Sequence, residues 1–391
     1  MDNKITKKRL SELLAYDWLK ILGLGILSVF AWVLIFSFAA PRLLRGQDFS
    51  LFITPFVNRA DDYFVEELYD KKESILSYDI LKKYVNKFNA KAANELMSTR
   101  AATHEGDIFI ADAVWDKDEF KYDKEKPENN VIQNCSLQTY LDAGYNFCVI
   151  DDFLLEGMLY GAKFFKDEFV FPDCSREQFA TNEQITQKVT LFLTTLENYN
   201  TSYEDMIDDD KVLQAFKQRK KKDNAYKTKK QYQAGAVKDK ARIVKVLKES
   251  VEVYKALARL DAEYGGYENN PLRLNYHRFE IAYTLLYYEV EGDVSKMDQE
   301  LVDIYNNNES LHTYGISLGG IESAQIGGVS IARKDAIIGN SFRLATNNDK
   351  ATAEGVAMSV FAYQKYQADL HFESVFVIRH VLNEFTTLFD N

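Results

Sequence analysis

An uncharged stretch of 20 residues, Ile21–Ala40, constrains the chain more than any other feature of its sequence. A helix of this length rises about 30 Å at roughly 1.5 Å per residue, which is the thickness of the hydrocarbon core of a bilayer. Trp18 precedes the stretch, where an interfacial aromatic residue is expected, and Pro41 and Arg42 follow it. We therefore predict a single transmembrane helix over residues 21–40.

The charges on the two sides of this stretch predict its direction, because positively charged flanks stay in the cytoplasm. Only Arg42 and Arg45 follow the stretch closely. More cationic residues precede it, namely Lys4, Lys7, Lys8, Arg9 and Lys20. We expect a cytoplasmic segment over residues 1–20 and a main domain on the outer side of the cell membrane.

A cleaved signal peptide and a buried core helix are the alternatives for the same stretch. Ser37, Phe38 and Ala39 ahead of Ala40 form a small-x-small pattern that suits signal peptidase. The apolar run is longer than the usual 7 to 15 residues of a signal peptide, which favours a retained anchor. No Leu-x-x-Cys lipobox follows the stretch, so lipid attachment through a cysteine is not expected.

Composition indicates a folded protein that does not bind nucleic acid. Apolar residues at 46% and aromatic residues at 14% supply the buried surface that offsets the entropy of ordering a chain. A net charge of -11 opposes binding to a phosphate backbone, so nucleic acid is not expected as a partner. The length of 391 residues exceeds the roughly 150 residues of one domain and predicts two domains or lobes.

Cysteine and histidine patterns predict neither a metal site nor a disulfide framework. The chain has three cysteines, Cys135, Cys148 and Cys174, so they cannot all pair with one another. Their spacing includes no CxxC element. The five histidines are scattered without an HExxH or HxxxH pattern. We expect mostly buried or free thiols, no metal and no cofactor.

The sharpest strand signal is Gly106–Asp112, where a turn residue precedes three large apolar residues and an acid. The dense apolar run Phe49–Val57 is predicted to be the first strand. Between them, apolar residues recur at helical spacing over 73–89, and residues 94–97 are predicted to form a short strand. This order predicts a βαβ unit, a parallel sheet and the α/β class.

Sequence patterns predict that the middle of the chain is largely helical. Residues 182–199 follow a Thr or Asn cap, and residues 242–264 end at Gly265–Gly266. The other expected elements are a charged loop at 116–130, a strand at 147–150, a turn or short helix at 153–160, and helices at 272–290 and 294–305. Two or three antiparallel helices here would form a helical subdomain.

The last part of the chain combines strands and helices. Residues 314–318 and 328–332 are predicted to be short strands, with 336–338 extending the second. Amphipathic helices are predicted over 352–367 and 372–389.

Residues 217–242 hold eleven basic residues and two acids. One interpretation is a cationic ridge that docks on anionic headgroups or wall polymers. The other is a solvated loop that runs into a long helix, which is the commoner role of a charge run. The sequence favours the second interpretation.

No catalytic set can be assembled from the sequence. The pairs Gly319–Gly320 and Gly327–Gly328 lack a phosphate-loop pattern, so turns explain them better. No SxxK stands out near a Lys-Thr-Gly, so a serine nucleophile of that type is not expected. Adjacent acids such as Asp151 and Asp152 would point to opposite faces of a strand and could not share one substrate. The chain is therefore predicted not to be an enzyme.

The acid that ends the predicted strand 106–112 is the strongest ligand-binding candidate. Ligands of an open α/β sheet bind outside the carboxyl ends of its strands. Asp112 would accept hydrogen bonds there, and Trp115 would offer a stacking face for a sugar or a cation. Tyr314, in a later predicted strand, is the third expected ligand-binding residue. The alternative is that Asp112 is a cap and Trp115 packs in the core.

These motifs resemble a known family. The opening strand, the helix ending in Phe88–Asn89, the strand Gly106–Asp112, and the late strand Tyr314–Leu318 with its closing helices resemble bacterial extracellular solute-binding proteins. The likeness is to the type 2 periplasmic-binding fold, in a divergent membrane-anchored form, and covers residues 51–112 and 310–391. It implies two α/β lobes with a ligand cleft and no covalent chemistry.

The expected organisation is a transmembrane helix followed by a two-lobed periplasmic-binding-like ectodomain with a helical insertion. Its parts are a cytoplasmic segment 1–20, the transmembrane helix 21–40, an α/β lobe 47–203, a basic and helical middle region 204–309, and a C-terminal α/β segment 310–391 that completes the lobes. The middle region has no obvious counterpart in the family, so the fold could be kept while transport is not.

Two functions agree with these patterns. The first is a membrane-anchored, substrate-binding-like protein that binds a small solute, such as a saccharide, for a transport system. Its partners would be a small-molecule ligand or a membrane transporter subunit, with the lipid bilayer contacted through residues 21–40. The second is a non-enzymatic envelope structural or assembly protein that binds other membrane proteins. A closed cleft lined by Trp and Tyr would favour the first, and a filled cleft with an exposed apolar patch the second.

Overall fold

The expected membrane segment lies almost wholly within one long helix. In the computed structural model, α1 (Lys7–Ala39) is a 33-residue helix of one compact unit, Met1–Leu44, and Arg45–Asn391 form a second unit. Among the described residues, no helix combines the length and the apolar character that crossing a membrane requires. The transmembrane role of residues 21–40 stays a prediction.

The structure describes residues 7–39, 47–59, 75–89, 93–103, 105–113, 137, 140, 147–175, 177, 180–278, 299–347, 351–362 and 372–390. The charged loop expected at 116–130 lies outside these ranges, as do Trp115 and Cys135. Most of the helix predicted over 272–290 also lies outside them.

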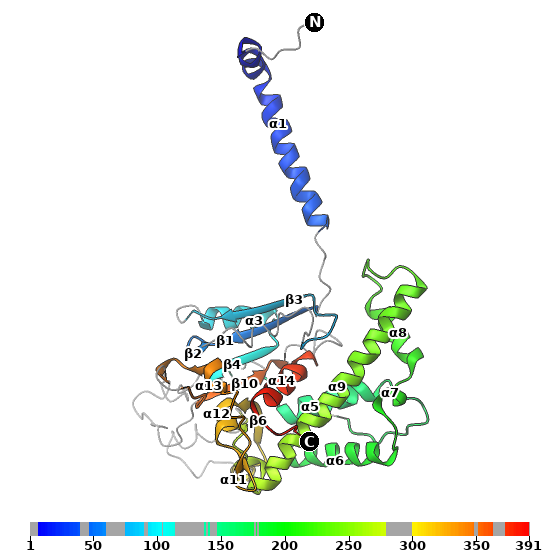
Figure 1. Cartoon of the computed structure of the whole chain (residues 1–391), viewed down its shortest axis with the longest axis vertical. Helices are drawn as coiled ribbons and strands as arrows, with labels where there is room; N and C mark the ends of the chain where they lie inside the picture. The colour runs from blue at the N-terminus through cyan, green and yellow to red at the C-terminus, as the bar shows by residue number, and fades with distance from the viewer. Residues whose placement is uncertain are drawn as a thin grey trace. The chain divides into compact units, whose positions relative to one another are not determined.

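A six-stranded sheet forms the centre of the second unit (Figure 1). Its strand order is β3-β1-β4-β10-β6-β5. The strands are β1 (Asp48–Ile53), β3 (Lys82–Lys87), β4 (Ile108–Asp112), β5 (Arg273–His277), β6 (Leu311–Ser317) and β10 (Val356–Val360). Strands from both ends of the sequence meet in this sheet, and the predicted α/β class is confirmed.

The sheet contains both parallel and antiparallel pairs. β1 runs parallel to β3 and β4, and Leu51 lies opposite both Val85 and Ile108. β10 runs antiparallel to β4 and β6, and β5 runs antiparallel to β6. β3, α3 (Ala93–Thr103) and β4 form a βαβ unit whose two strands flank β1. A βαβ unit is therefore present, but its first strand and its helix lie where a helix and a strand were predicted, and the sheet is mixed rather than parallel.

Each face of the sheet has its own hydrophobic core, because successive side chains of a strand point to opposite faces. Ile108 and Ile110 of β4 belong to the larger core. Phe109 belongs to the smaller core, where it lies with Phe52 and Phe361. Met97 of α3 covers part of that smaller core.

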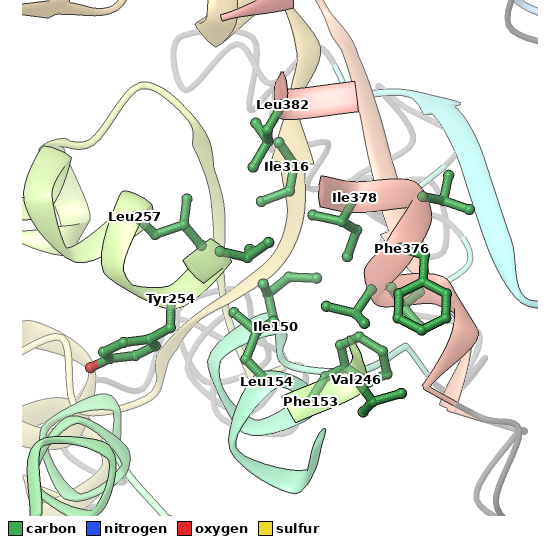
Figure 2. Close-up of a cluster of buried hydrophobic side chains, with 14 of the residues drawn as sticks. Ile150, Phe153, Leu154, Val246, Tyr254, Leu257, Ile316, Phe376, Ile378 and Leu382 are labelled. Carbon is green, nitrogen blue, oxygen red and sulfur yellow. The ribbon is translucent and has the colours of Figure 1, made fainter. Parts of the chain in front are cut away.

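Three helices cover the larger core on one face of the sheet: α5 (Ile150–Ala162), α9 (Lys229–Tyr264) and α14 (Glu373–Phe385). Figure 2 shows Phe153 and Leu154 of α5 beside Val246 of α9 and Phe376 of α14. Burying each large apolar side chain contributes about 1.5–3 kcal/mol, so this core is the main source of stability.

Side-chain caps fix the ends of the middle helices. The middle helices are α6 (Asn182–Asn198), α7 (Tyr203–Met206), α8 (Asp209–Arg219) and α9. Thr181 and Gln184 form a capping box at the start of α6, in which each side chain accepts from the other residue's amide. Thr228 and Gln231 repeat the arrangement at the start of α9. Gly265, with φ 72°, ends α9 in the left-handed conformation that favours glycine.

The remaining elements are short. They are β2 (Val57–Arg59) paired with β9 (Phe342–Leu344), β7 (Gln325–Ile326) paired with β8 (Val329–Ser330), the helices α11 (Gln299–Asn306), α12 (Leu318–Ser323) and α13 (Ile338–Ser341), and the 3-10 helices η3 (Tyr267–Asn269) and η5 (Ala345–Asn347).

Several predicted elements are confirmed. The strand predicted at 106–112 is β4, and the helices predicted over 182–199, 242–264 and 372–389 are α6, α9 and α14, although α9 begins earlier than predicted. α5 replaces the expected turn or short helix at 153–160.

Four other predictions are wrong. The helix predicted over 73–89 contains β3, and the strand predicted at 94–97 lies in α3. The helices predicted over 272–290 and 352–367 contain β5 and β10. β10 is buried along its whole length, so its apolar run carries no period that separates a strand from a helix. β3 pairs with a strand far away in the sequence, which a local pattern does not report.

Two smaller predictions also need correction. The strand predicted at 147–150 is reduced to an isolated bridge between Phe147 and Phe361, and α5 begins at Ile150. The strand extension predicted at 336–338 is not formed, because Ile338 begins α13.

Candidate functional site

The carboxyl ends of three parallel strands lie at one edge of the sheet. The chain passes from β1 to β3 on one side and then returns to β4 on the other side of β1. The strand order therefore reverses between β1 and β4. Ligands of open α/β sheets bind outside the carboxyl ends at such a reversal. Thr54, directly after β1, and Asp112, the last residue of β4, lie at this point.

A hydrogen bond joins the two strand ends. Thr54 Oγ1 donates to Asp112 Oδ1 at 3.1 Å. The Thr54 amide also donates to the carbonyl of Ile110 at 3.0 Å, which holds the residue against β4. Thr54 is fully buried, whereas Asp112 is half-buried. The strand ends therefore orient a carboxylate that is still partly open to solvent.

β6 ends and β10 begins at the same edge. The amide of Ala113 donates to the carbonyl of Gly355 at 2.7 Å, which ties the end of β4 to the start of β10. Ser317 is the last residue of β6. Its Oγ accepts a hydrogen bond from the amide of Gly320 at 3.0 Å and caps the start of α12. Backbone and hydroxyl groups of four segments therefore surround the Asp112 edge.

The structure does not bring the predicted ligand-binding residues together. Asp112 lies at the edge, and by alternation with Ile110 its side chain is on the face of the larger core. Tyr314 lies within β6 and packs against the smaller core on the opposite face. Its ring centroid lies 6.4 Å from that of His312. Trp115 lies outside the described residues.

The edge has the chemistry of a polar binding site. An ionised carboxylate has about four acceptor positions, so Asp112 can accept further donors besides Thr54. Phe56, in the turn between β1 and β2, is 55% exposed and adds an apolar ring near the end of β1. Sequence reasoning missed Thr54 and Phe56. Their position directly after a dense apolar strand was the available signal.

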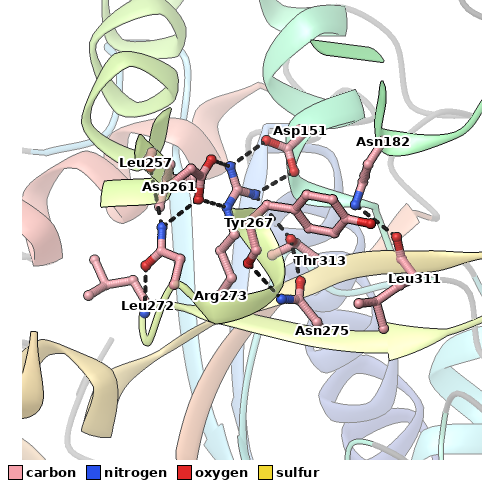
Figure 3. Close-up of polar contacts among 11 residues, drawn as sticks. Asp151, Asn182, Leu257, Asp261, Tyr267, Leu272, Arg273, Asn275, Leu311 and Thr313 are labelled. Atoms are coloured by element: carbon pink, nitrogen blue, oxygen red, sulfur yellow. Dashed lines mark hydrogen bonds and ion pairs between the residues drawn. The ribbon is translucent and has the colours of Figure 1, made fainter. Parts of the chain in front are cut away.

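A second polar cluster lies between the helices and the sheet (Figure 3). The guanidinium of Arg273 donates to both oxygens of Asp151 and to both oxygens of Asp261, and also to Thr313 Oγ1. All five N–H groups of this guanidinium are therefore used within the protein. The cluster joins β5, α5, α9 and β6, and we interpret it as structural.

A third cluster joins α8 to α9 and contains Arg219, Asp239 and Arg242. Asp239 Oδ1 accepts from Arg219 at 2.6 Å and from Arg242 at 3.0 Å. Burial by itself would raise the pKa of Asp239, but the charges of Arg242 and Arg219 outweigh burial and lower it. Arg242 also donates to the Tyr160 hydroxyl at 2.5 Å. Asp239 and Arg242 are buried, and Arg219 is partly exposed, so the cluster extends from the interior to the surface of α8.

A surface cavity of about 560 Å³ lies where α7 and α8 meet the end of α5. Most residues that line it are acidic, including Asp167, Asp205 and Asp209, and Lys240 pairs with Asp209 at 2.7 Å. Within the described residues, no group of three or more His, Cys, Asp or Glu side chains could hold a metal ion.

The two described cysteines, Cys148 and Cys174, are buried. Burial raises the pKa of the Cys174 thiol. Both observations agree with the expected buried thiols.

Comparison of the chain with protein-family models, with curated proteins and with solved structures found no match.

Proposed function

We propose that the chain is a membrane-anchored extracytoplasmic binding protein that takes a small polar solute, such as a saccharide, for a transport system. The observation that carries this proposal is the hydrogen bond between Thr54 and Asp112 at the point where the strand order reverses. A half-buried carboxylate suits the hydroxyl groups of a sugar or the ammonium group of a cation. The Asp112 edge is therefore the proposed solute site.

The proposed anchor is the stretch 21–40, which lies almost wholly within α1. The lysine-rich residues 1–20 would stay in the cytoplasm and the second unit would lie outside. A two-lobed, periplasmic-binding-like organisation with a helical insertion also belongs to this proposal. Its support is that β6 and β10, from the C-terminal part of the chain, complete a sheet begun by β1, β3 and β4.

One observation favours a second function, an envelope structural or assembly protein that binds other membrane proteins. Tyr314, expected in a ligand cleft, packs against the smaller core, and helices cover the sheet face on which Asp112 lies. A sheet that is covered in this way suits a rigid scaffold better than a hinged receptor.

Thermal unfolding of the full chain in detergent, with a panel of saccharides and amino acids, tests the solute site. A ligand that binds only the folded state stabilises it by about 2.7 kcal/mol when present at 100 times its Kd. Asp112→Asn and Thr54→Val should remove the ligand-dependent rise in Tm, because they remove the charge and the hydroxyl while keeping the side-chain volume. Asp167→Asn, at a side chain 96% exposed on α5's C-terminal side, is the matched control and should keep the rise.

The outcomes separate the two functions. A rise that Asp112→Asn removes and Asp167→Asn keeps supports the solute site. A flat panel, together with crosslinks from the second unit to an integral membrane protein in intact cells, would favour the assembly function. A rise that both variants keep would show a solute site elsewhere in the chain.

Labelling of single cysteines in intact cells tests the anchor. A cysteine at Lys222 should react with a membrane-impermeant maleimide, and a cysteine at Lys4 should react only after the cells are opened. The reverse pattern would overturn the proposed direction of the chain.

A further inference from the structure

The turn that joins α8 to α9 concentrates positive charge. We call residues 217–230 the basic turn; they carry eight cationic residues and one acid in a chain whose net charge is -11. Six of its lysines are exposed: Lys217, Lys221, Lys222, Lys227, Lys229 and Lys230. Among the described residues, none of these six ammonium groups has an ion-pair partner. The basic turn therefore presents unneutralised charge to its surroundings.

The single acid of the basic turn is already engaged. Asp223 is 20% exposed and lies 3.7 Å from the ammonium of Lys220, which is itself buried. The fully exposed charges of the turn are therefore all cationic.

Ring packing and a helix cap give the basic turn a defined backbone conformation. The rings of Phe216 and Tyr226 lie edge to face with centroids 5.0 Å apart, and Tyr226 lies 5.9 Å from Tyr232. The capping box of Thr228 and Gln231 then starts α9. Aromatic packing and a cap already fix the backbone of the turn. Binding to a ligand through its lysines would therefore cost little further backbone conformational entropy.

The basic turn lies next to the point where the chain enters the sheet. Asp79 Oδ1 accepts from the ammonium of Lys220, and also from the Gln47 side chain at 3.0 Å. Gln47 immediately precedes β1 and is itself buried. A single buried carboxylate therefore holds the basic turn beside the first described residue of the second unit.

The length of the chain limits how far this point can be from a bilayer. Seven peptide steps separate Ala40, the end of the proposed anchor, from Gln47. At about 3.6 Å per step, they span no more than roughly 25 Å. With residues 21–40 in a membrane, the entry to β1 stays close to its surface.

We infer that the basic turn docks on the anionic phospholipid headgroups of the bilayer in which the chain is anchored. Each lysine near an anionic membrane surface strengthens binding by about fivefold. The docked turn and the anchor would hold the second unit in one orientation over the membrane. This inference rests on the proposed membrane anchor.

Lysine footprinting of the full chain in nanodiscs tests the docking. Acetylation rates of individual lysines are measured by mass spectrometry in zwitterionic nanodiscs and in nanodiscs with 30% phosphatidylglycerol. In the anionic nanodiscs the exposed lysines of the basic turn should react at least about threefold more slowly, and 0.5 M NaCl should restore their rates because salt screens the attraction. Lys163, Lys248 and Lys334, which are exposed outside the basic turn, are internal controls and should react equally in both.

A pair of matched variants tests whether the charge of the turn causes the protection. Lys221→Gln with Lys222→Gln should weaken the protection of Lys229 and Lys230 in anionic nanodiscs. Lys248→Gln with Lys255→Gln, an equal change of charge elsewhere on exposed side chains, should leave it intact. Equal losses in both double variants, or protection that is the same in both kinds of nanodisc, would overturn the inference.

Failure of the anchor gives a different result from failure of the docking. If the anchor is absent, the chain does not enter nanodiscs of either composition and remains outside them in size-exclusion chromatography. If only the docking is wrong, the chain enters both but its turn lysines react equally. Protection by soluble polyphosphate in zwitterionic nanodiscs, without protection by phosphatidylglycerol, would assign the turn to a polyanionic polymer and overturn the lipid assignment.

Discussion

Arg273 of β5 and Asp151 of α5 face each other through two hydrogen bonds, from Nη1 to Oδ2 at 2.6 Å and from Nη2 to Oδ1 at 3.0 Å. Both residues are buried. The planar guanidinium fixes the direction of both bonds, which a lysine could not do. The pair therefore sets how the helical layer is placed against the outer strand of the sheet.

Asp151→Asn should lower the free energy of unfolding by about 1.5–3 kcal/mol, the usual contribution of a hydrogen bond to a charged group. The loss arises because the variant removes the charge of one of the two carboxylates that pair with Arg273, and Asp261 remains as the other. Urea unfolding of the full chain in detergent, followed by circular dichroism, measures it. The double variant Asp151→Leu with Arg273→Met should lose less than the sum of the single changes, since apolar side chains can replace a buried pair. A strictly additive double variant would contradict this account.

An exposed ion pair provides the control for that experiment. Lys255 Nζ and Glu197 Oε1 lie 3.4 Å apart, and their side chains are 49% and 69% exposed. Glu197→Gln should change the free energy of unfolding by less than about 1 kcal/mol, because solvent screens the attraction.

Asp107 should make the protein less stable as the pH rises. Burial raises the pKa of Asp107 well above its ordinary value of 3.8, although the Ser50 amide donates to it at 2.7 Å. The folded state therefore holds this proton more tightly than the unfolded chain does. The destabilisation that comes from ionising Asp107 in the folded state is absent below pH 3.8 and grows as the pH rises toward the folded pKa. Asp107→Asn should flatten this fall in urea unfolding measured from pH 3.8 upward, and an unchanged slope would argue against it.

Asp239 should have the opposite pH dependence. Arg242 and Arg219 hold its pKa below 3.8 in spite of its burial. Its contribution to stability is therefore present above pH 3.8 and is lost as the pH falls through the folded pKa. Asp239→Asn should cost more stability at pH 6 than near pH 3 in the same urea series. A cost that does not vary with pH would mean that packing, and not charge, determines the role of Asp239.

The helices that were predicted best are those with both a clear apolar stripe and a cap. α6 has Thr181 at its start, and α9 has Gly265 at its end, so a local pattern contains nearly all the information needed. β3 and β10 depend on pairing with β1 and β4 across long stretches of sequence. Tertiary contacts decide the conformation of these two segments and override their local helix or strand propensity.

The candidate site was predictable only in part. Asp112 could be found because an acid directly after a buried apolar strand must lie at a sheet edge. Its hydrogen-bond partner Thr54 could not, since the pairing of β1 with β4 decides which residue lies beside it. The position of Lys220 beside Gln47 was also hidden, because it depends on a shared contact with Asp79.

Gly320 should tolerate no side chain. A Cβ at this position would lie 1.8 Å from the carbonyl oxygen of Pro271, so α12 or the approach to β5 would have to shift. Overpacking usually costs about 1–3 kcal/mol and occasionally more, and we expect Gly320→Ala to lie at or above the upper end. Gly327→Ala is the control, because nothing lies within 4 Å of its Cβ and only its φ of 57° opposes the change. That left-handed conformation should cost about 1–2 kcal/mol. Urea unfolding of both variants compares them, and equal losses would show that the contact with Pro271 does not constrain the fold.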